Sequence, residues 1–261
     1  MRDEEHASDS AAKKSRQPRK VFAEVGIAIS TSLDATCDAI SGATGRKVHC
    51  DQQYAAVRAW AKISTRDKLM SDPLAERFRE FVHEAPVVRD ELLLCFRGRF
   101  IRRGHSHDAE HMGPPCEEHA PSGRYNKEHE PVLYLCDAAA GVQCELRRRQ
   151  SDGKLYCQEY LIPSGSMRIA DLAQGESDSL GTQVLEFAEQ RTGSGDPAYP
   201  LLSQAVAEIV REAEFDGMVV RGAQAQPEQH YRNIVIFDPW LNERWRDWLA
   251  PAAEPHAIDP T

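Results

Sequence analysis

The sequence predicts an α+β fold, in which a helical N-terminal extension precedes a domain of short strands and connecting helices. Three observations support this prediction. Apolar residues recur at helical spacing between residues 51 and 85, short apolar runs typical of buried strands begin near residue 88, and a long amphipathic pattern begins near residue 200. The chain shows no internal repeat.

The N-terminal part divides into a tail and a helical extension. Residues 1–20 are polar, and we expect them to be disordered. Residues 21–87 are expected to form the extension, with Asp51 as the N-cap of one helix and Pro73 in the first turn of a second helix. The apolar residues of these two predicted helices are Tyr54, Val57, Trp60, Ala61 and Ile63, then Leu74, Phe78, Phe81 and Val82.

Residues 88–240 are expected to form the main domain, and residues 241–261 a C-terminal extension. Apolar runs predict strands in ELLLCFRGRF, PVLYLCD, KLYCQEYLIP, MVVRG and NIVIFDP. Helices are predicted in AAAGVQCELRRR and in PLLSQAVAEIVREAEF, the second of which should end at Asp216-Gly217. The long connection after the first strand is typical of a functional or mobile loop.

Composition excludes several classes of protein. With 41% hydrophobic and 28% charged residues, the 261-residue chain has a globular composition. No run of 18 apolar residues occurs, so we expect no membrane-spanning helix. The net charge of −9 disfavours direct binding of nucleic acid. Seven cysteines without a CxxC pair, and no apolar secretory signal, favour reduced thiols and a cytoplasmic location.

Potential metal ligands crowd the loop at residues 105–119. They are His105, His107, His111, Cys116 and His119. Zinc prefers such residues at short spacing, but no CxxC pair anchors the segment. We therefore predict no metal site here. The alternative to zinc binding is a mobile loop that closes over a site elsewhere in the domain.

Four polar residues beside the predicted strands form a candidate nucleotide site. Arg97 and Arg124 carry planar guanidinium groups that match phosphate oxygens in pairs. Tyr134 offers an aromatic face and a hydroxyl. Glu145 follows Tyr134 by one strand–turn–helix unit, and a carboxylate stabilises the positive charge that grows on a ribose as its glycosidic bond breaks.

Each of these residues also has an ordinary structural interpretation. Arg97 continues into further arginines within residues 99–103, which is typical of a solvated basic stretch. Tyr134 has the setting of a core tyrosine with a satisfied hydroxyl. Glu145 precedes three arginines at residues 147–149, as an exposed helical residue often does. Spacing alone does not decide between these interpretations and a site.

The motifs FRGR, GRYNKEHEPVLYLCDAAAGVQCEL and GMVVRG…YRNIVIFDP resemble the RES domain, a family named for Arg, Glu and Ser residues. The resemblance covers residues 88–240, and it is specific because order, spacing and residue type agree. The matching positions are Gly123, Arg124, Tyr125, Asn126, Pro131, Leu133, Tyr134 and Glu145.

The resemblance implies a fold, a substrate and a partner. RES proteins have a split β core similar to that of ADP-ribosylating toxins, and they degrade NAD by hydrolysis or phosphorolysis. NAD is then the substrate, and no further cofactor is implied. Such proteins are typically the toxin of a bacterial toxin–antitoxin pair, whose antitoxin is an Xre-type protein that covers the active site.

The resemblance also implies a role for each residue of the site. Arg97 and Arg124 would hold the pyrophosphate, next to Tyr125. Tyr134 would position the nicotinamide or its ribose, and Glu145 would stabilise the ribosyl cation.

The sequence departs from the family pattern in one place. The late serine should follow the strand MVVR, where this chain has Arg221-Gly222-Ala223-Gln224. Arg221 or Gln224 is the candidate replacement as a substrate-binding group. The departure keeps two alternatives open: an ADP-ribosyltransferase that modifies a macromolecule, and a non-catalytic domain that binds a nucleotide or a protein partner.

Overall fold

The computed structural model describes residues 52–90, 92–102, 109–146, 153–163, 167–174, 179–192, 196–222, 231–239, 244–248 and 255–258. The predicted tail and the first half of the predicted extension lie outside these residues. The chain divides into two units, residues 1–56 and residues 57–261, and every strand among the described residues lies in the second unit.

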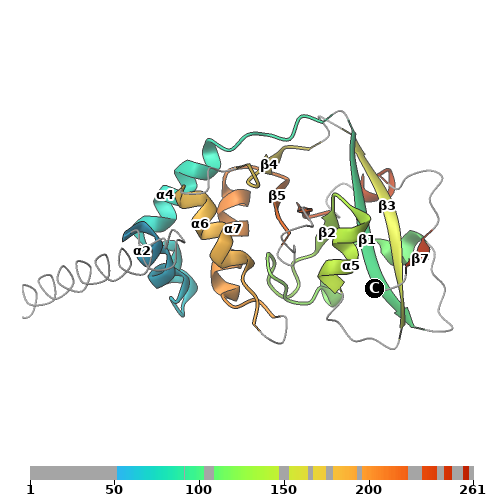
Figure 1. Ribbon diagram of the computed structural model, residues 1–261, viewed down its shortest axis with the longest axis horizontal. Coiled ribbons are helices and arrows are strands. Elements are labelled where there is room, and N and C mark those ends of the chain that lie inside the picture. Colours follow the sequence, from blue (N-terminus) through green and yellow to red (C-terminus); the bar gives the residue numbers. More distant parts are fainter. Residues whose placement is uncertain are drawn as a thin grey trace, which may run out of the picture. The chain divides into compact units, whose positions relative to one another are not determined.

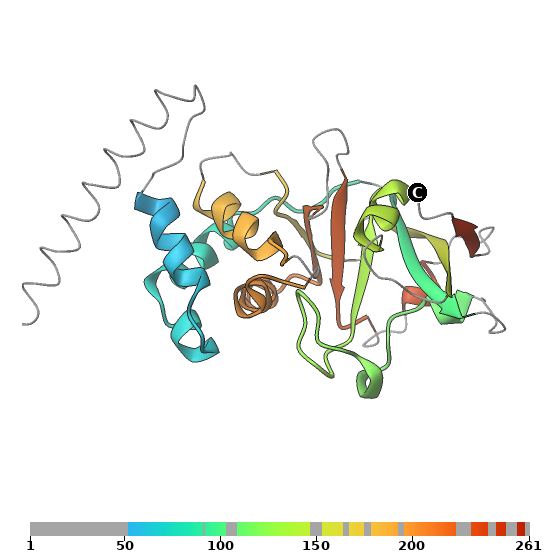
Figure 2. The same ribbon diagram turned by 60° about the horizontal axis from the view of Figure 1, so that its bottom comes forward.

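A seven-stranded mixed sheet forms the centre of the second unit. Its strand order is β4-β5-β6-β2-β1-β3-β7, and all neighbours are antiparallel except β4 and β5. Figure 2 shows β5, β6 and β2 side by side. The strands are β1 (Leu92–Arg102), β2 (Val132–Cys136), β3 (Gly153–Pro163), β4 (Ile169–Asp171), β5 (Gly217–Arg221), β6 (Arg232–Phe237) and β7 (His256–Ile258).

The sheet consists of two blocks that meet at one narrow seam. β1 pairs with β3 along its whole length, and β2 pairs with β6 along its whole length. β1 and β2, by contrast, are in register only at Phe96 and Cys136. The predicted α+β fold with a split β core is confirmed, and each of the five apolar runs predicted as strands contains one.

Six α-helices and three short 3₁₀ helices accompany the described strands. They are α2 (Gln52–Ala61), α3 (Arg66–Met70), α4 (Pro73–His83), α5 (Ala139–Leu146), α6 (Leu180–Glu189), α7 (Pro200–Glu212), η1 (Ala109–Met112), η2 (Glu117–His119) and η3 (Arg244–Arg246). The predicted N-terminal helices are confirmed. α4 begins as expected, since Asp72 accepts a hydrogen bond from the Leu74 amide at 2.9 Å and Pro73 follows it.

The helices gather in two places. α4, α6 and α7 contact one another, and α7 contacts β5 (Figure 1). α5 contacts β1 and β2, so it crosses the seam between the two blocks. α7 ends at Glu212, earlier than the expected Asp216-Gly217. The reason is local, because Glu214 already adopts a left-handed φ of 60°, and Gly217 begins β5.

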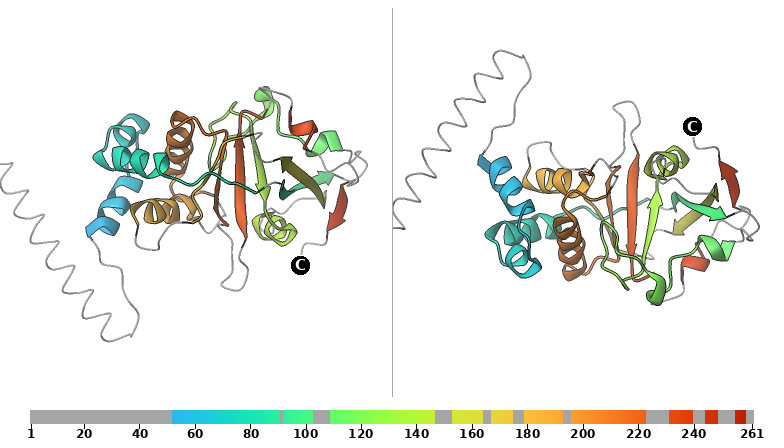
Figure 3. Two further views of the ribbon diagram at one scale, coloured as in Figure 1. Left: turned by 90° about the horizontal axis from the view of Figure 1, so that it is seen from above. Right: turned by 90° about the horizontal axis from the view of Figure 1, so that it is seen from below.

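The two faces of the sheet carry different layers. Figure 3 shows α5 (yellow-green) on one side of the sheet and η3 (orange-red) on the other. On the α5 face, Cys136 and Tyr231 pack with Val142 of α5. On the opposite face, Leu133 of β2 packs with Trp245 of η3. Strand alternation therefore decides which polar residues share a layer with α5.

Candidate functional site

Glu145, in the last turn of α5, is the centre of a polar cluster. Its side chain is 14% exposed. One carboxylate oxygen, Oε1, accepts hydrogen bonds from the Tyr231 hydroxyl at 3.0 Å and from Asn233 Nδ2 at 2.8 Å. The other oxygen, Oε2, forms an ion pair with Arg191, which follows α6. Three donors from two different elements therefore hold both oxygens of one carboxylate.

The strand pattern explains why Tyr231 and Asn233 meet Glu145. The two residues alternate with Arg232 at the start of β6, so their side chains share one face. Cys136 is opposite Asn233 in the register and donates from its thiol to Asn233 Oδ1 at 3.3 Å. α5 starts within three residues of Cys136, and this short connection places Glu145 over the same face.

Arg124 and Tyr125 lie in a buried turn before β2. Only 8% of Arg124 and 1% of Tyr125 are exposed. Arg124 Nη2 has no hydrogen-bond partner among the described residues, although its guanidinium lies 5.9 Å from the centre of the Tyr125 ring. Burial raises the pKa of Tyr125 well above its ordinary value, so its hydroxyl stays protonated. A buried guanidinium with a spare donor is suited to an anionic ligand.

Tyr134 lies on the α5 face of β2, where it is 36% exposed. Its hydroxyl donates to Asn126 Oδ1 at 2.9 Å and accepts from the Tyr125 amide at 2.9 Å. Asn126 in turn donates to the carbonyl oxygens of Pro121, Lys127 and Glu130 at distances from 2.8 to 3.0 Å. The hydroxyl of Tyr134 therefore fixes the turn, while about a third of the residue is exposed.

Glu189, at the C-terminal end of α6, lies within the electrostatic influence of both Arg124 and Glu145. Its Oε1 atom is buried without a hydrogen-bond partner among the described residues. Burial raises the pKa of Glu189 to about 8; Arg124 and Arg221 oppose this shift, and Glu145 reinforces it. Near neutral pH the Glu189 carboxyl is thus mostly protonated, and arginine charge predominates around it.

Arg97 is separated from this cluster. It alternates with Cys95 on β1, so it lies on the face of the sheet opposite Glu145. It is 8% exposed, and its Nε and Nη1 atoms have no hydrogen-bond partner among the described residues. Burial lowers the pKa of Arg97 to about 10; Tyr160 opposes this shift, and Arg99 reinforces it.

The remaining predicted substrate-binding residues lie near the end of β5. Arg221 is the last residue of that strand, and its Nε atom donates to the Ala173 carbonyl at 3.4 Å. Gln224 lies outside the described residues. The structure thus brings Arg124, Tyr125, Tyr134 and Glu145 to one face of the sheet, with Arg221 close enough to influence Glu189.

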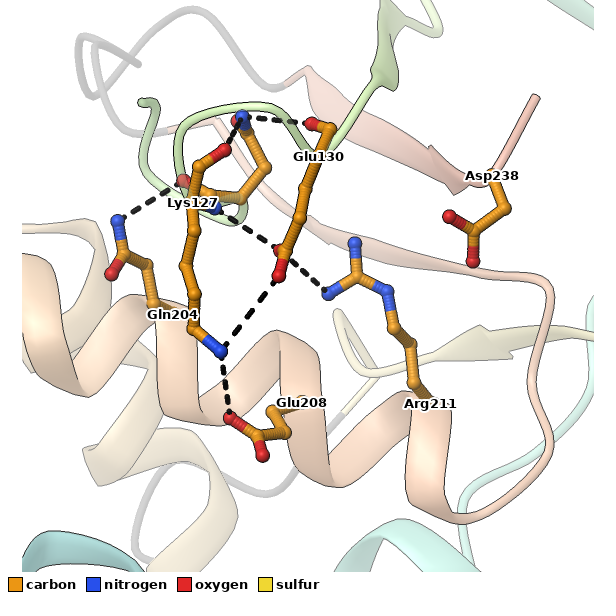
Figure 4. Close-up of a pocket in the computed structure, with 7 residues that line it drawn as sticks. Lys127, Glu130, Gln204, Glu208, Arg211 and Asp238 are labelled. Carbon is orange, nitrogen blue, oxygen red and sulfur yellow. Dashed lines mark hydrogen bonds and ion pairs between the residues drawn. The ribbon is translucent and has the colours of Figure 1, made fainter. Parts of the chain in front are cut away.

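A cavity of about 290 Å³ lies on the far side of the buried turn, between the turn and α7 (Figure 4). It is lined by Asn126, Lys127, Glu130, Gln204, Glu208, Arg211 and Asp238. Lys127 bridges two of these acids, at 3.7 Å to Glu130 and 3.6 Å to Glu208. Since most of its charges are already paired, the cavity is part of the support of the turn.

The histidine-rich loop is described only in part, because His105 and His107 lie outside the described residues. Cys116 Sγ and His119 Nδ1 are 2.9 Å apart. Within the described ranges, no group of three potential metal ligands occurs.

None of the helices among the described residues is long and apolar enough to cross a membrane.

Sequence reasoning missed four residues of the cluster: Glu189, Arg191, Tyr231 and Asn233. The signal for the last two was present, because polar residues alternate at the start of an otherwise apolar strand, YRNIVIF. Glu189 is the last residue of the amphipathic helix α6 and Arg191 follows it, far along the chain from Glu145. Only the tertiary fold brings them to Glu145.

The comparison with protein families agrees with this geometry. The model of the RES domain matches residues 99–249, which is more than half of the chain. The chain therefore belongs to the RES domain family.

One solved structure similar to this chain is described as the crystal structure of the M. tuberculosis MbcT-MbcA toxin-antitoxin complex. The match covers 72% of this chain and 94% of the other chain, with 11% sequence identity and a TM-score of 0.45. No curated protein matches the sequence significantly.

Proposed function

We propose that this protein cleaves the nicotinamide–ribose bond of NAD and transfers the ADP-ribosyl group to water or phosphate. The observation that carries the proposal is the Glu145 carboxylate held by Tyr231, Asn233 and Arg191, in a member of the RES family. In this reaction the C1′–N bond breaks, its electron pair leaves with neutral nicotinamide, and the acceptor oxygen bonds to C1′ and loses its proton to solvent.

Charge supports the proposed binding mode. Arg124 has a buried unused donor, and Arg221 adds a second positive charge near Glu189. The pyrophosphate of NAD carries negative charge that would match this set. Tyr134, which is 36% exposed, would contribute its aromatic face to binding an aromatic base of NAD. Glu145 would stabilise the ribosyl cation as the bond breaks. Arg97 is omitted from the proposed site because it lies on the other face of the sheet.

Release of nicotinamide by the purified protein tests the proposal. The wild-type chain should convert NAD to nicotinamide, with ADP-ribose as product in water or its phosphate ester in phosphate buffer. Glu145→Gln should lower kcat by about 100-fold or more, because it removes the charge that stabilises the transition state. Absence of nicotinamide release by the wild-type chain in both buffers would refute both versions of the reaction.

Two further outcomes would change the function assigned to the same site. Labelled ADP-ribose found on a protein rather than in solution would indicate a transferase. Tight NAD binding without turnover would indicate a non-catalytic domain, an alternative favoured by the Arg221-Gly222 sequence at the place of the family serine.

We also propose a protein antitoxin of the Xre type as partner, which would make this chain the toxin of a pair. Family membership supports this proposal. Expression of the chain alone should arrest bacterial growth and deplete NAD, and the Glu145→Gln variant should do neither. Growth arrest without loss of NAD would separate toxicity from the proposed reaction.

A further inference from the structure

The ring of Tyr231 occupies a slot between two glycines from different elements. A Cβ atom added at Gly141 of α5 would lie 2.6 Å from Tyr231 Cδ2. A Cβ atom added at Gly222, directly after β5, would lie 2.2 Å from Tyr231 Cε2. Both distances are shorter than real Cβ contacts. Any side chain at either position would therefore have to displace the tyrosine ring.

The main chain fixes the same ring from a third direction. The Gly222 amide donates to the Tyr231 carbonyl at 2.9 Å, which closes the end of the β5–β6 pair. Tyr231 is 5% exposed, and its ring belongs to the apolar cluster under α5. The ring thus has one position that is compatible with both glycines and with the strand pairing.

The fixed ring places the Tyr231 hydroxyl against the carboxylate of Glu145. This hydroxyl donates at 3.0 Å to Glu145 Oε1, the oxygen that also accepts a hydrogen bond from Asn233. Arg191 holds the other oxygen. Hydrogen bonds to a charged group are stronger than those between neutral groups, so these three donors hold the Glu145 side chain in one orientation.

We propose that Tyr231 is the positioning residue that orients the Glu145 carboxylate, and that Gly141 and Gly222 are glycines because the ring needs their space. This inference rests on the proposed function and deepens it. Tyr231 does not need to touch NAD, since it acts through Glu145. The slot gives Gly222 a role in the site although a glycine supplies no side chain.

Steady-state kinetics of Tyr231→Phe test the inference directly. The variant keeps the ring and loses only the hydroxyl, so kcat should fall roughly 10- to 100-fold, the equivalent of one hydrogen bond to a charged group. The KM for NAD and the Tm should remain close to their wild-type values. The matched control is Tyr156→Phe on β3, whose side chain alternates with Cys157 and lies away from the α5 face. It should retain wild-type kcat.

Gly222→Ala provides a second, independent arm. It should also lower kcat, because the added methyl group displaces the ring. If it acts through the hydroxyl, it should have little further effect on kcat in the Tyr231→Phe background. Unchanged kcat in Tyr231→Phe, or additive effects of the two substitutions, would overturn the inference.

The failure of the proposed function would be recognised separately. If wild-type protein releases no nicotinamide, crystal structures of the wild type and of Tyr231→Phe decide the positional claim. A Glu145 side chain that turns away from Asn233 in the variant supports it. An unmoved carboxylate refutes it.

Discussion

The buried carboxyl group of Glu189 couples the protonation of one residue to the stability of the whole fold. The surrounding protein disfavours its charged form, chiefly through desolvation. The folded chain therefore binds a proton that the unfolded chain releases at an ordinary glutamate pKa. Between these two pKa values, unfolding releases a proton, so stability has to depend on pH.

Glu189→Gln should remove this dependence. The pKa of Glu189 is raised from 4.5 to about 8, so its contribution is complete below pH 4.5 and is lost as pH rises towards 8. Relative to Glu189→Gln, the wild-type free energy of unfolding should decline by up to about 1.4 kcal/mol per pH unit in that window. Denaturant titrations from pH 5 to pH 9 measure the difference. The exposed Glu118, which is not among the charges that shift the pKa of Glu189, supplies the control, Glu118→Gln, and an equal slope in all three proteins would contradict the expectation.

Arg97 illustrates a charge that the fold tolerates at a cost. Its guanidinium is buried, and among the described residues it forms no ion pair. Arg97→Met should raise the free energy of unfolding by about 1–4 kcal/mol, because it replaces a desolvated charge by an apolar chain of similar length. The KM for NAD should not change. Arg99→Met, at an exposed position of the same strand, should bring no such gain. If Arg97→Met raised the KM for NAD strongly and did not stabilise the protein, Arg97 would have to be included in the substrate-binding site.

For single residues, the sequence predicts which residue types form a site better than it predicts which of these residues lie together in the fold. The motif around Arg124, Tyr134 and Glu145 indicated a site, and the structure brings these residues to one face. The same reasoning grouped Arg97 with them, although strand alternation from Cys95 directs it to the other face. The direction of a side chain depends on the register between strands, and a single sequence does not contain the register.

Among the elements, the turn that carries Arg124 depends most on a distant helix. Gln204 of α7 donates from its Nε2 atom to Ser122 Oγ, to the Gly123 carbonyl and to the Asn126 carbonyl, at 3.0 to 3.2 Å. These bonds tie the turn to α7 beside the cavity in Figure 4. Local chain stiffness alone would not keep such a turn in one place.

Gln204→Met should loosen the turn without unfolding the domain. The substitution removes the shared donor and leaves carbonyl oxygens unsatisfied, which costs about 1–3 kcal/mol. Amide hydrogen exchange should accelerate at Tyr125, whose N–H is bonded to the Tyr134 hydroxyl. The KM for NAD should rise more than kcat falls, since Arg124 loses its fixed position. Gln190→Met, at an exposed glutamine after α6, is the control. Unchanged exchange at Tyr125 would show that the turn is held by other contacts.

Elements were easier to predict than their ends and their order. Apolar periodicity located five of the seven strands and the amphipathic helices α4 and α7, because burial on one face imposes that pattern directly. The end of α7 was placed too late, since a left-handed Glu214 gives no signal comparable to glycine. The parallel pairing of β4 with β5 joins segments far apart in the chain, and nothing in either segment specifies the partner.

On the scale of the whole second unit, the fold class was predictable and the cluster around Glu145 was predictable only in part. The resemblance of the sequence to the RES family was sufficient to indicate the split β core. The four missed residues of the cluster come from the end of α6 and the start of β6, which the sheet topology brings to α5. Only the complete arrangement of the blocks defines the surroundings of the carboxylate.

The narrow seam between the two sheet blocks has a mechanical consequence. α5 contacts β1 in one block and β2 in the other, while the two strands are paired only at Phe96 and Cys136. The helix that carries Glu145 therefore also spans the joint on its own face of the sheet. A load that opened the joint would tilt this helix and pull its carboxylate away from β6 before either block lost its own strand pairing.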